Sequence, residues 1–338
     1  MSSLRPYNSN VPTELSTASE HYVREAFSAN TLRGYKSQLA QWSTWATANG
    51  AVPSPANPTA VAAWLSDRAR AGSSRATIGV AMAAICWAHQ MRGERFDADH
   101  PVLTAVLKGI RRAADTARSQ RQARPLTAKL LRHVLSANTE TLHQCRDAAV
   151  AALLYSFGLR RSELVELDFQ RQGRGLGVFA IGGDRARVTL LRSKSAQTEA
   201  EIVEIERDNN PRAFAAIEAW ILKGQIALGT PLVRGIDPAG TVSDRPLHAN
   251  RVSHAVKAAV TRYYIAEGTE PSKASEIADQ FSGHSGRIGL VVSAVEAGAS
   301  DTSVMSITRH KSPAMVARYG KQARQRLASP HRLKGVGV

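Results

Sequence analysis

The chain reads SGHSGR at residues 282–287, RHKS at 309–312 and ARYG at 317–320. These motifs place two histidines, an arginine and a tyrosine in one C-terminal region. A site that holds a phosphodiester, moves protons and forms a covalent bond without a metal needs side chains of these types. Taken alone, His284 is more commonly a core histidine and Tyr319 a tyrosine packed on a helix face. The interpretation therefore depends on what the remaining chain supplies.

Charge is the most unusual property of the composition. Among 338 residues, 44 are Lys or Arg and 28 are Asp or Glu, which leaves a formal net charge of +16. Such a field attracts polyanions and favours a protein that binds nucleic acid, with a basic enzyme indifferent to nucleic acid as the alternative. The length suits two domains, and an apolar content of 43% allows each domain to bury a core.

The two cysteines give no sign of a disulfide framework or a metal site. Cys86 and Cys145 stand in apolar helical contexts, without a CxxC motif or a histidine at zinc spacing. Residues 2–17 are polar and lack the apolar core of a signal peptide, and no run approaches the ~20 apolar residues of a membrane span. We therefore predict a cytoplasmic protein with no membrane partner.

Helical periodicity dominates the first half of the chain. We predict a flexible segment at residues 1–19 and a helical domain at residues 20–112. Ser28 or Asn30 is the expected N-cap of the first helix, and Thr59 is the expected N-cap of the second. Apolar spacings of three and four predict further helical segments at 61–65, 76–90 and 102–112.

Basic residues are concentrated between residues 108 and 132, where they face the single acid Asp115. The middle of this run lacks apolar periodicity and Pro125 interrupts it, so we predict an interdomain linker at residues 113–126. Its charge suits DNA phosphates, and a solvated charged linker is the alternative. The candidate phosphate contacts are Arg118, Arg121 and Arg124 in the linker, with Arg33, Lys36 and Arg75 in the helical domain.

The second half of the chain is helical with one β-rich segment. Thr127 is the expected N-cap of a helix at 129–136, and a strongly apolar helix follows at 145–158. Short β-type runs at 178–181, 188–191 and 201–205 predict a small antiparallel sheet. The predicted fold class is therefore mainly α: the helical domain at 20–112, then a second helical domain at 127–328 that carries the sheet, then a tail at 329–338.

Two further features of the second half point to phosphate or DNA. Arg160 stands where the apolar helix ends and another begins, which gives a planar guanidinium a rigid base from which to reach a phosphate. A helix at 247–264 presents Asn250, Arg251 and His254 on a polar face, which suits insertion into a major groove.

Five elements follow one another along the chain: GLRRSEL at 158–164, RSK at 192–194 in a predicted β-turn, HSGR at 284–287, His310, and Tyr319 nine residues later. In this order they resemble the tyrosine recombinase (phage integrase) family, and among its members the simple two-domain Cre-like site-specific recombinases. The resemblance covers residues 20–327, with the first half more loosely similar to the family's core-binding helical domain. A lone HxxR motif carries little weight, whereas five elements in family order are specific.

The resemblance implies a covalent mechanism. Tyr319 would attack a backbone phosphate, form a 3′-phosphotyrosyl link and release a 5′-hydroxyl. A phenol, with a pKa of about 10 in water, needs nearby positive charge or a base to act as a nucleophile. Arg160 and Arg287 would clamp the non-bridging oxygens, on which negative charge develops.

The remaining catalytic roles follow from the same resemblance. Lys194 would protonate the leaving 5′ oxygen, because a lysine desolvated beside DNA titrates low enough to do so. His284 would act in proton transfer or phosphate positioning, and His310 would donate a hydrogen bond to the phosphate. Glu163 would support the site from behind, although a capping-box carboxylate at a helix start explains it as well. The phosphotyrosyl bond conserves the energy of the phosphodiester, so no metal, ATP or other cofactor is implied.

The resemblance also implies partners. A homotetramer would act on two double-stranded DNA target sites, built as inverted repeats, and exchange strands through a Holliday junction. The two domains would clamp the duplex in a C shape, and a C-terminal helix at 321–327 would dock into a neighbouring protomer. Three alternatives stay open: a type IB topoisomerase-like DNA-relaxing enzyme, a non-catalytic DNA-binding protein of the same fold, and a basic protein that binds or modifies RNA.

The chain departs from the family pattern at three places. Arg161 beside Arg160 makes it ambiguous which arginine reaches the phosphate, and the spacing to Glu163 favours Arg160. Thr308 and Arg309 replace the Leu-Gly that often precedes the second histidine, which we expect to change local packing more than chemistry. The groove-facing helix of the first half carries only small residues at 79, 81 and 83, so the family's site specificity cannot be transferred.

Overall fold

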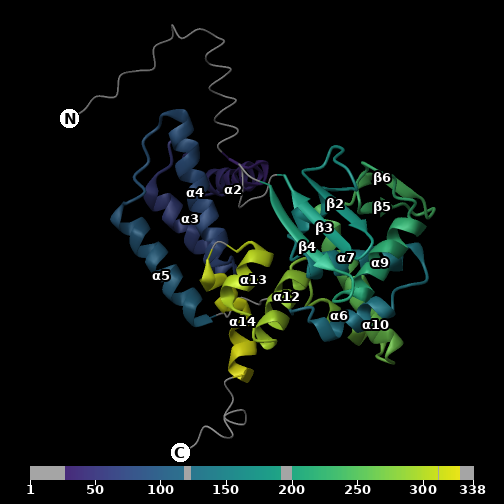
Figure 1. Ribbon diagram of the computed structural model, residues 1–338. Coiled ribbons are helices and arrows are strands. Elements are labelled where there is room, and N and C mark those ends of the chain that lie inside the picture. The colour runs from purple at the N-terminus through teal and green to yellow at the C-terminus, as the bar shows by residue number, and fades with distance from the viewer. Residues whose placement is uncertain (1–26, 118–122, 192–199, 311, 328–338) are drawn as a thin grey trace, which may run out of the picture. The chain divides into compact units, whose positions relative to one another are not determined.

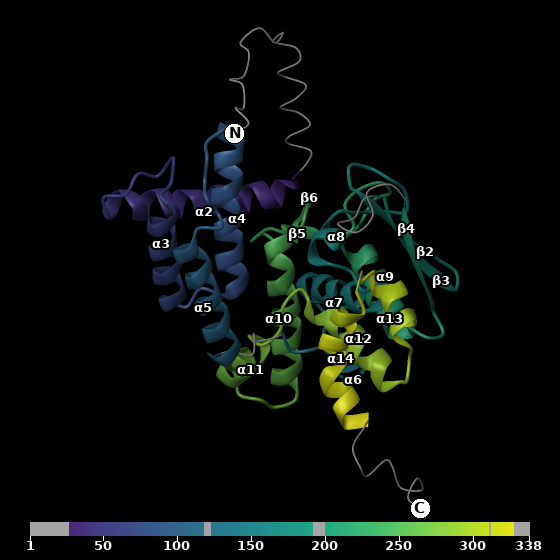
Figure 2. The same ribbon diagram turned by 90° about the vertical axis from the view of Figure 1, so that its left-hand side faces the viewer.

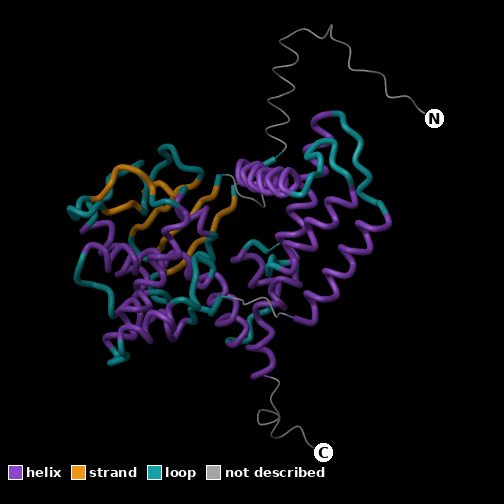
Figure 3. The backbone as a smooth tube through the Cα atoms, turned by 180° about the vertical axis from the view of Figure 1, so that it is seen from behind, coloured by secondary structure: helices purple, strands orange, loops and turns teal. Residues whose placement is uncertain are grey.

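The computed structural model describes residues 27–117, 123–191, 200–310 and 312–327 (Figure 1). Its contacts divide the chain into two compact units, residues 1–121 and 122–338. Among the described residues, all strands lie in the second unit, and helices make up most of both units (Figure 3). The predicted fold class, mainly α with a small sheet in the C-terminal part, is confirmed. None of the helices in the described ranges is long and apolar enough to cross a membrane.

The first unit consists of helices that share one aromatic-rich core. Trp42 and Trp64 are buried with ring centroids 5.4 Å apart, and Leu65, Ile85 and Leu103 pack around them. Trp42 and Trp64 are therefore core residues of this unit. The helices are α2 (Ala29–Ala48), α3 (Pro58–Arg70), α4 (Arg75–Arg92) and α5 (Pro101–Ala117).

The ends of these helices correct two sequence-based predictions. Asn57, and not Thr59, is the N-cap of α3, because its Oδ1 accepts a hydrogen bond from the Thr59 backbone N–H at 2.8 Å while Pro58 occupies the first helical turn. The helix α5 continues to Ala117, into the segment that we predicted as a linker. Ser28 caps α2, one of the two residues proposed for that role.

The second unit is built around the buried helix α7 (Leu142–Ser156), whose apolar residues contact most of its neighbours. Thr127 caps α6 as predicted, with its Oγ1 accepting from the Leu130 backbone N–H at 3.4 Å. The other helices are α6 (Ala128–Ser136), α8 (Arg161–Val165), α9 (Pro211–Lys223), α10 (Ala249–Ala266), α11 (Pro271–Ala278), α12 (Ser285–Glu296), α13 (Asp301–Thr308) and α14 (Pro313–Leu327).

The main sheet has the strand order β1-β2-β3-β4 and covers the three predicted runs. These are β2 (Gly177–Gly182), β3 (Arg185–Leu190) and β4 (Glu201–Glu206), which pair antiparallel as expected. The sheet is not purely antiparallel, however, because β1 (Leu167–Phe169) pairs parallel to β2. All residues of β1 are buried, so the alternation that signals a strand is absent. A separate hairpin of β5 (Arg234–Ile236) and β6 (Val242–Pro246) was also not predicted.

The helices α12, α13 and α14 lie side by side at the C-terminal end of the unit (Figure 2). The helix α12 approaches α7 so closely that a Cβ on Gly286 would lie 2.7 Å from the Leu154 Cβ and 2.9 Å from the Tyr155 backbone N. Only glycine fits at this crossing, which explains its place in the HSGR motif. The helix α14 runs without a break from Pro313 to Leu327, so the predicted separate helix at 321–327 is wrong and Tyr319 lies inside a longer helix.

Candidate active site

Four elements of the second unit bring most of the predicted catalytic residues together. Arg160 is the N-cap of α8 and Glu163 lies in the same helix. His284 is the N-cap of α12, and Arg287 lies in the first turn of that helix. His310 lies between α13 and α14, and Tyr319 lies on α14.

Arg287 is buried and fixed by the turn that precedes α8. Its Nη1 donates a hydrogen bond to the Gly158 carbonyl at 2.6 Å, and its Nε donates to His310 Nε2 at 3.3 Å. Gly158 has a φ of +55°, and a Cβ there would lie 3.2 Å from Leu290 and 3.4 Å from Thr308, so this turn requires glycine. The Nη2 of Arg287 is buried and has no hydrogen-bond partner among the described residues. Burial, followed by the charge of Arg160, lowers the Arg287 pKa to about 10.

Arg160 and Glu163 form a buried capping box. The Arg160 backbone N–H donates to Glu163 Oε2 at 2.8 Å, and the Arg160 Nη1 donates to Glu163 Oε1. Arg161 is exposed, whereas the Arg160 side chain is 22% exposed and points into the cluster. The geometry thus favours Arg160 over its neighbour. Burial would raise the pKa of the Glu163 carboxyl, but Arg309 and Arg160 together hold that pKa below its ordinary value.

The hydrogen bonds of His310 select a neutral ring. The Thr308 hydroxyl donates to the Val304 carbonyl at 2.6 Å, so at 2.8 Å from His310 Nδ1 it accepts the Nδ1 proton. The Nε2 atom then accepts from Arg287. Burial, followed by Arg287 and Arg160, lowers the His310 pKa to about 4. Since both ring nitrogens are engaged, His310 can donate to a phosphate, as the resemblance implies, only after Arg287 releases Nε2.

His284 shares the basic surroundings of His310. Its backbone N–H donates to the Ser282 hydroxyl at 3.1 Å, which closes the turn before α12. Burial, followed by the charges of Arg287 and Arg161, lowers its pKa. An imidazole whose pKa is lowered is neutral at pH 7 and can accept a proton.

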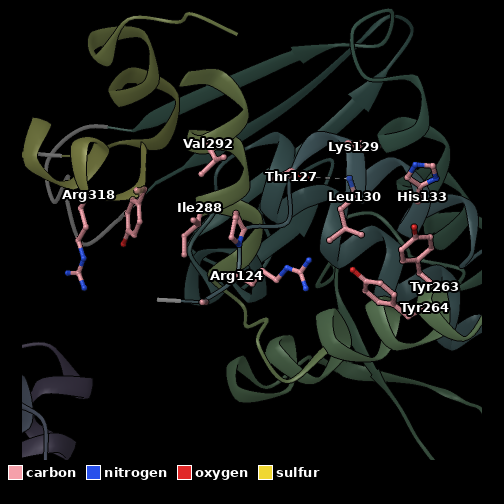
Figure 4. Close-up of a pocket in the computed structure, with 13 residues that line it drawn as sticks. Arg124, Thr127, Lys129, Leu130, His133, Tyr263, Tyr264, Ile288, Val292 and Arg318 are labelled. Carbon is pink, nitrogen blue, oxygen red and sulfur yellow. Dashed lines mark hydrogen bonds between the residues drawn. The ribbon is translucent and has the colours of Figure 1, made fainter. Parts of the chain in front are cut away.

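Tyr319 lies beside His310 and lines a cavity. The two rings have centroids 5.7 Å apart, and Tyr319 is half-buried against the small cluster that includes Ile288, Val292 and Val316. The cavity, drawn in Figure 4, has a volume of about 690 Å³. Basic and aromatic side chains line much of it: Arg124, Lys129, His133, Tyr263, Tyr264 and Arg318.

One buried arginine beside the site was not among the predicted site residues. Arg309 is 8% exposed and its φ is +55°, in the left-handed region. Its Nη2 lies 2.8 Å from Glu163 Oε2 and its Nε lies 3.3 Å from Glu201 Oε2, so it pairs with two carboxylates behind the site. In the sequence, Arg309 stood out only because Thr308 and Arg309 replace the Leu-Gly of the family pattern.

Three predicted site residues, Lys194, Arg118 and Arg121, lie outside the described residues. Lys194 falls between β3 and β4 in the sequence, and Glu201 is the first residue of β4.

The predicted DNA-contacting residues that are described lie on exposed surfaces. Asn250, Arg251 and His254 are exposed on one face of α10, opposite buried residues that include Val252 and Val256. The other candidates, Arg33, Lys36, Arg75 and Arg124, are exposed as well. Arg124 also packs within its own unit, since its guanidinium carbon lies 5.5 Å from the centroid of the Phe281 ring. Their contact with DNA stays a prediction.

Both parts of the chain match models of one protein family. Residues 124–326 match the phage integrase family, and residues 20–90 match the phage integrase N-terminal SAM-like domain. The chain is 26% identical over 317 residues to an integrase/recombinase xerD homolog from Selenomonas ruminantium, which covers 91% of this chain and 86% of that relative.

Solved structures share the fold. The Tn1549 transposon integrase in complex with transposon right end DNA is 17% identical to this chain, with a TM-score of 0.56. The superposed part covers 92% of this chain and 98% of the integrase chain. A lambda integrase dimer bound to a COC′ core site is 16% identical, with a TM-score of 0.51. Here the superposed part covers 91% of this chain and 76% of the lambda integrase chain. The match to the phage integrase family model over more than half of its length places the chain in the phage integrase, or tyrosine recombinase, family.

Proposed function

We propose that this protein is a site-specific DNA recombinase that cuts and rejoins duplex DNA through a 3′-phosphotyrosyl intermediate. The observation that carries the proposal is the meeting of Arg160, Arg287, His310 and Tyr319 in one unit, with a buried and unpartnered Nη2 on Arg287 among the described residues. A buried guanidinium N–H without a partner is costly, and a phosphate oxygen would satisfy it.

The chemistry proceeds by positioning and charge stabilisation. The Tyr319 hydroxyl oxygen attacks the phosphorus, the bond from phosphorus to the 5′ oxygen breaks, and the 3′ phosphate becomes joined to the tyrosine. Arg160 and Arg287 neutralise the non-bridging oxygens as the transition state forms. When the phosphate takes up Arg287, that arginine leaves Nε2 of His310. His310 then takes up a proton from solvent at Nε2 and donates it in a hydrogen bond to a phosphate oxygen. His284, whose lowered pKa keeps it neutral near pH 7, accepts the proton of the Tyr319 hydroxyl, and Lys194 supplies the proton for the leaving 5′ oxygen.

Strand exchange between two sites extends this reaction. Ligation of a 5′-hydroxyl from a second duplex reverses the cleavage step, and two such exchanges pass through a Holliday junction. We propose that a homotetramer performs this strand exchange on two DNA sites built as inverted repeats. Support comes from the relative, named an integrase/recombinase, and from the neighbours, whose structures contain DNA. The net charge of +16 fits a duplex partner.

Trapping the covalent intermediate tests the proposal. A set of nicked duplexes that tile the DNA flanking the gene is incubated with the full chain, and covalent adducts are detected by denaturing electrophoresis. We expect an adduct with the wild type and none with Tyr319→Phe. Tyr264→Phe is the matched control, because Tyr264 lines the same cavity and has no assigned role in the chemistry. An adduct that survives Tyr319→Phe, or none on any duplex that the wild type binds, would overturn the proposal.

The same preparation separates recombination from DNA relaxation. A recombinase joins two plasmids, or two sites on one plasmid, only where the trapped duplex sequence is present. An enzyme of the type IB topoisomerase kind relaxes supercoiled plasmids that lack this sequence and joins none.

A further inference from the structure

We propose that Arg309 is a positioning residue of the phosphate site: its guanidinium links Glu163 to Glu201, and its backbone places His310 beside Arg287. The inference rests on the proposed function, because it assumes that Arg160 and His310 meet the phosphate. It assigns a role to a residue at which this chain departs from the family pattern.

The backbone at Arg309 is unusual for its residue type. It ends α13 with a φ of +55°, a conformation that favours glycine and that L-residues with a side chain seldom adopt. The Arg309 N–H donates to the Met305 carbonyl at 2.7 Å, which closes the helix, and the chain then turns directly into His310. Glycine would adopt this turn without strain, so contacts of the arginine side chain have to compensate for it.

Those contacts reach three parts of the second unit. The Arg309 guanidinium donates to the Phe157 and Gly158 carbonyls, each at 3.3 Å, which are in the turn between α7 and α8. It pairs with Glu163 on α8 at 2.8 Å and with Glu201 at the start of β4 at 3.3 Å. The turn, the short helix and the sheet are thus joined through one side chain.

Hydrogen-bond partners, rather than burial, separate a catalytic from a positioning role. Arg287 and Arg309 are both buried, but Arg287 keeps its Nη2 without a partner among the described residues. In Arg309, Nη1 and Nη2 both donate to carbonyls or to Glu163 behind the site, and Nε lies 3.3 Å from Glu201 Oε2 without a hydrogen bond. Arg309 is therefore unsuited to be a third phosphate clamp, and it acts through the groups that it holds.

The group that it holds most directly is the Glu163 carboxylate. Oε1 accepts from Arg160 Nη1, while Oε2 accepts from both the Arg160 backbone and Arg309. The Arg160 Nη2 in turn donates to the Arg309 carbonyl at 3.4 Å. Removal of the Arg309 side chain leaves Glu163 paired with Arg160 alone, which frees the carboxylate and the guanidinium to shift together. A buried pair that loses a third member seldom keeps its geometry.

The test compares cleavage with binding in three variants. Arg309→Gly removes the side chain and suits the positive φ. Glu201→Gln weakens one of the two ion pairs and leaves the Glu163 pair in place. Arg262→Ala is the control, because Arg262 also pairs with a buried carboxylate, Asp147, in the same unit but takes no part in the site. Each is measured by single-turnover cleavage of the nicked duplex that traps the wild type, and by the Kd for the same duplex.

We expect Arg309→Gly to lower the cleavage rate constant by about 10- to 100-fold, by analogy with residues that support metal ligands from behind, while the Kd changes by less than about threefold. Glu201→Gln should lower the rate by a smaller factor, and the double variant should be no slower than Arg309→Gly. Arg262→Ala should lose thermal stability with little change in the rate. If Arg309→Gly does not fold, Glu201→Gln alone decides, and a wild-type rate in that variant rejects the proposal.

Three results distinguish this proposal from the proposed function. A wild-type chain that forms no adduct overturns both. A wild-type chain that forms the adduct, with Arg309→Gly cleaving within threefold of it or no worse than Arg262→Ala, leaves the recombinase in place and rejects the positioning role. A loss that appears equally in Kd and rate would show a general structural role and reject it as well.

Discussion

Glu163→Gln removes the buried negative charge behind the site while keeping the size of the side chain. In the native protein both carboxylate oxygens accept from arginine: Oε1 from Arg160, and Oε2 from the Arg160 backbone and from Arg309. A glutamine offers one oxygen and one amide group, so an N–H of the amide would face an arginine N–H. We therefore expect loss of both ion pairs and of half of the capping box.

The magnitude follows from the burial of the three groups. Removing one partner of a buried ion pair costs about 3–5 kcal/mol, because the remaining charge stays uncompensated. Glu163 and Arg309 have side chains that are 6% and 5% exposed, which fits this range. Arg160 is 22% exposed and regains part of its hydration, so the free energy of unfolding of the second unit should fall by about 3 kcal/mol.

The effect depends on pH with a definite sign. The folded-state pKa of Glu163 lies below 4.5 because of Arg309 and Arg160. The stabilisation by the carboxylate is therefore fully present above the pKa of an unfolded glutamate and is lost as the pH falls through the lower folded-state value. The difference between wild type and Glu163→Gln should be constant from pH 7 to about pH 5 and should shrink below 4.5.

Hydrogen exchange is the appropriate assay, since a chain of two units has no single unfolding free energy. Exchange of peptides from α8 and α12 in the full chain reports the opening of the site itself. A loss of about 3 kcal/mol should speed their exchange roughly a hundredfold at pH 7. Glu166→Gln is the control, because Glu166 is an exposed carboxylate at the C-cap of α8. It should change stability by no more than about 0.5 kcal/mol.

The reasoning is wrong if α8 and α12 of Glu163→Gln exchange as slowly as those of Glu166→Gln at pH 7. It is also wrong if a large difference persists unchanged below the folded-state pKa, because a protonated carboxyl cannot hold the two arginines as a carboxylate does.

Three further predictions concern packing, protonation and DNA binding. Gly286→Ala should destabilise the second unit by about 1–3 kcal/mol, measured by hydrogen exchange of α7 and α12 peptides, because its Cβ would lie 2.7 Å from that of Leu154. Gly79→Ala has open space around its Cβ in α4, and it should stabilise the first unit by up to about 1 kcal/mol in the same assay. His310→Gln should flatten the fall in unfolding free energy between pH 6.5 and about 4, because only the unfolded histidine takes up a proton in that window. Arg251→Ala should reduce the slope of log K against log salt for duplex binding by about 1, if this exposed arginine contacts a phosphate.

Each of these has a result that contradicts it. Equal effects of the two glycine substitutions would mean that the crossing of α7 and α12 tolerates a methyl group. A parallel pH dependence of His310→Gln and the wild type would show that His310 titrates normally when folded. An unchanged salt slope for Arg251→Ala would show that Arg251 contacts no DNA phosphate.

Local sequence patterns were sufficient to predict most of the helices and three of the strands. Thr127 and Ser28 sit next to the residues they cap, and alternation along β3 involves only neighbouring side chains. The strand β1 was missed because all of its residues are buried, so polar and apolar side chains do not alternate along it. Asn57 was missed as the N-cap of α3 because Thr59 is an equally acceptable cap in the sequence. Caps and alternation patterns can be recognised from the sequence because the residues that form them are only a few positions apart.

The order of the motifs was enough to indicate a phosphate-binding family, because five elements in one order are improbable by chance. What those motifs do to one another was decided by the tertiary structure. Arg160 meets Glu163 and Arg309, Arg287 meets Gly158 and His310, and these partners lie up to 149 residues apart. Propensity and charge act locally along the chain, whereas the tautomer of a histidine or the partner of a buried arginine depends on distances of a few ångströms between elements. Arg309 shows this most clearly: in the sequence it is a departure from a glycine, and in the folded chain it is the side chain that joins two carboxylates behind the site.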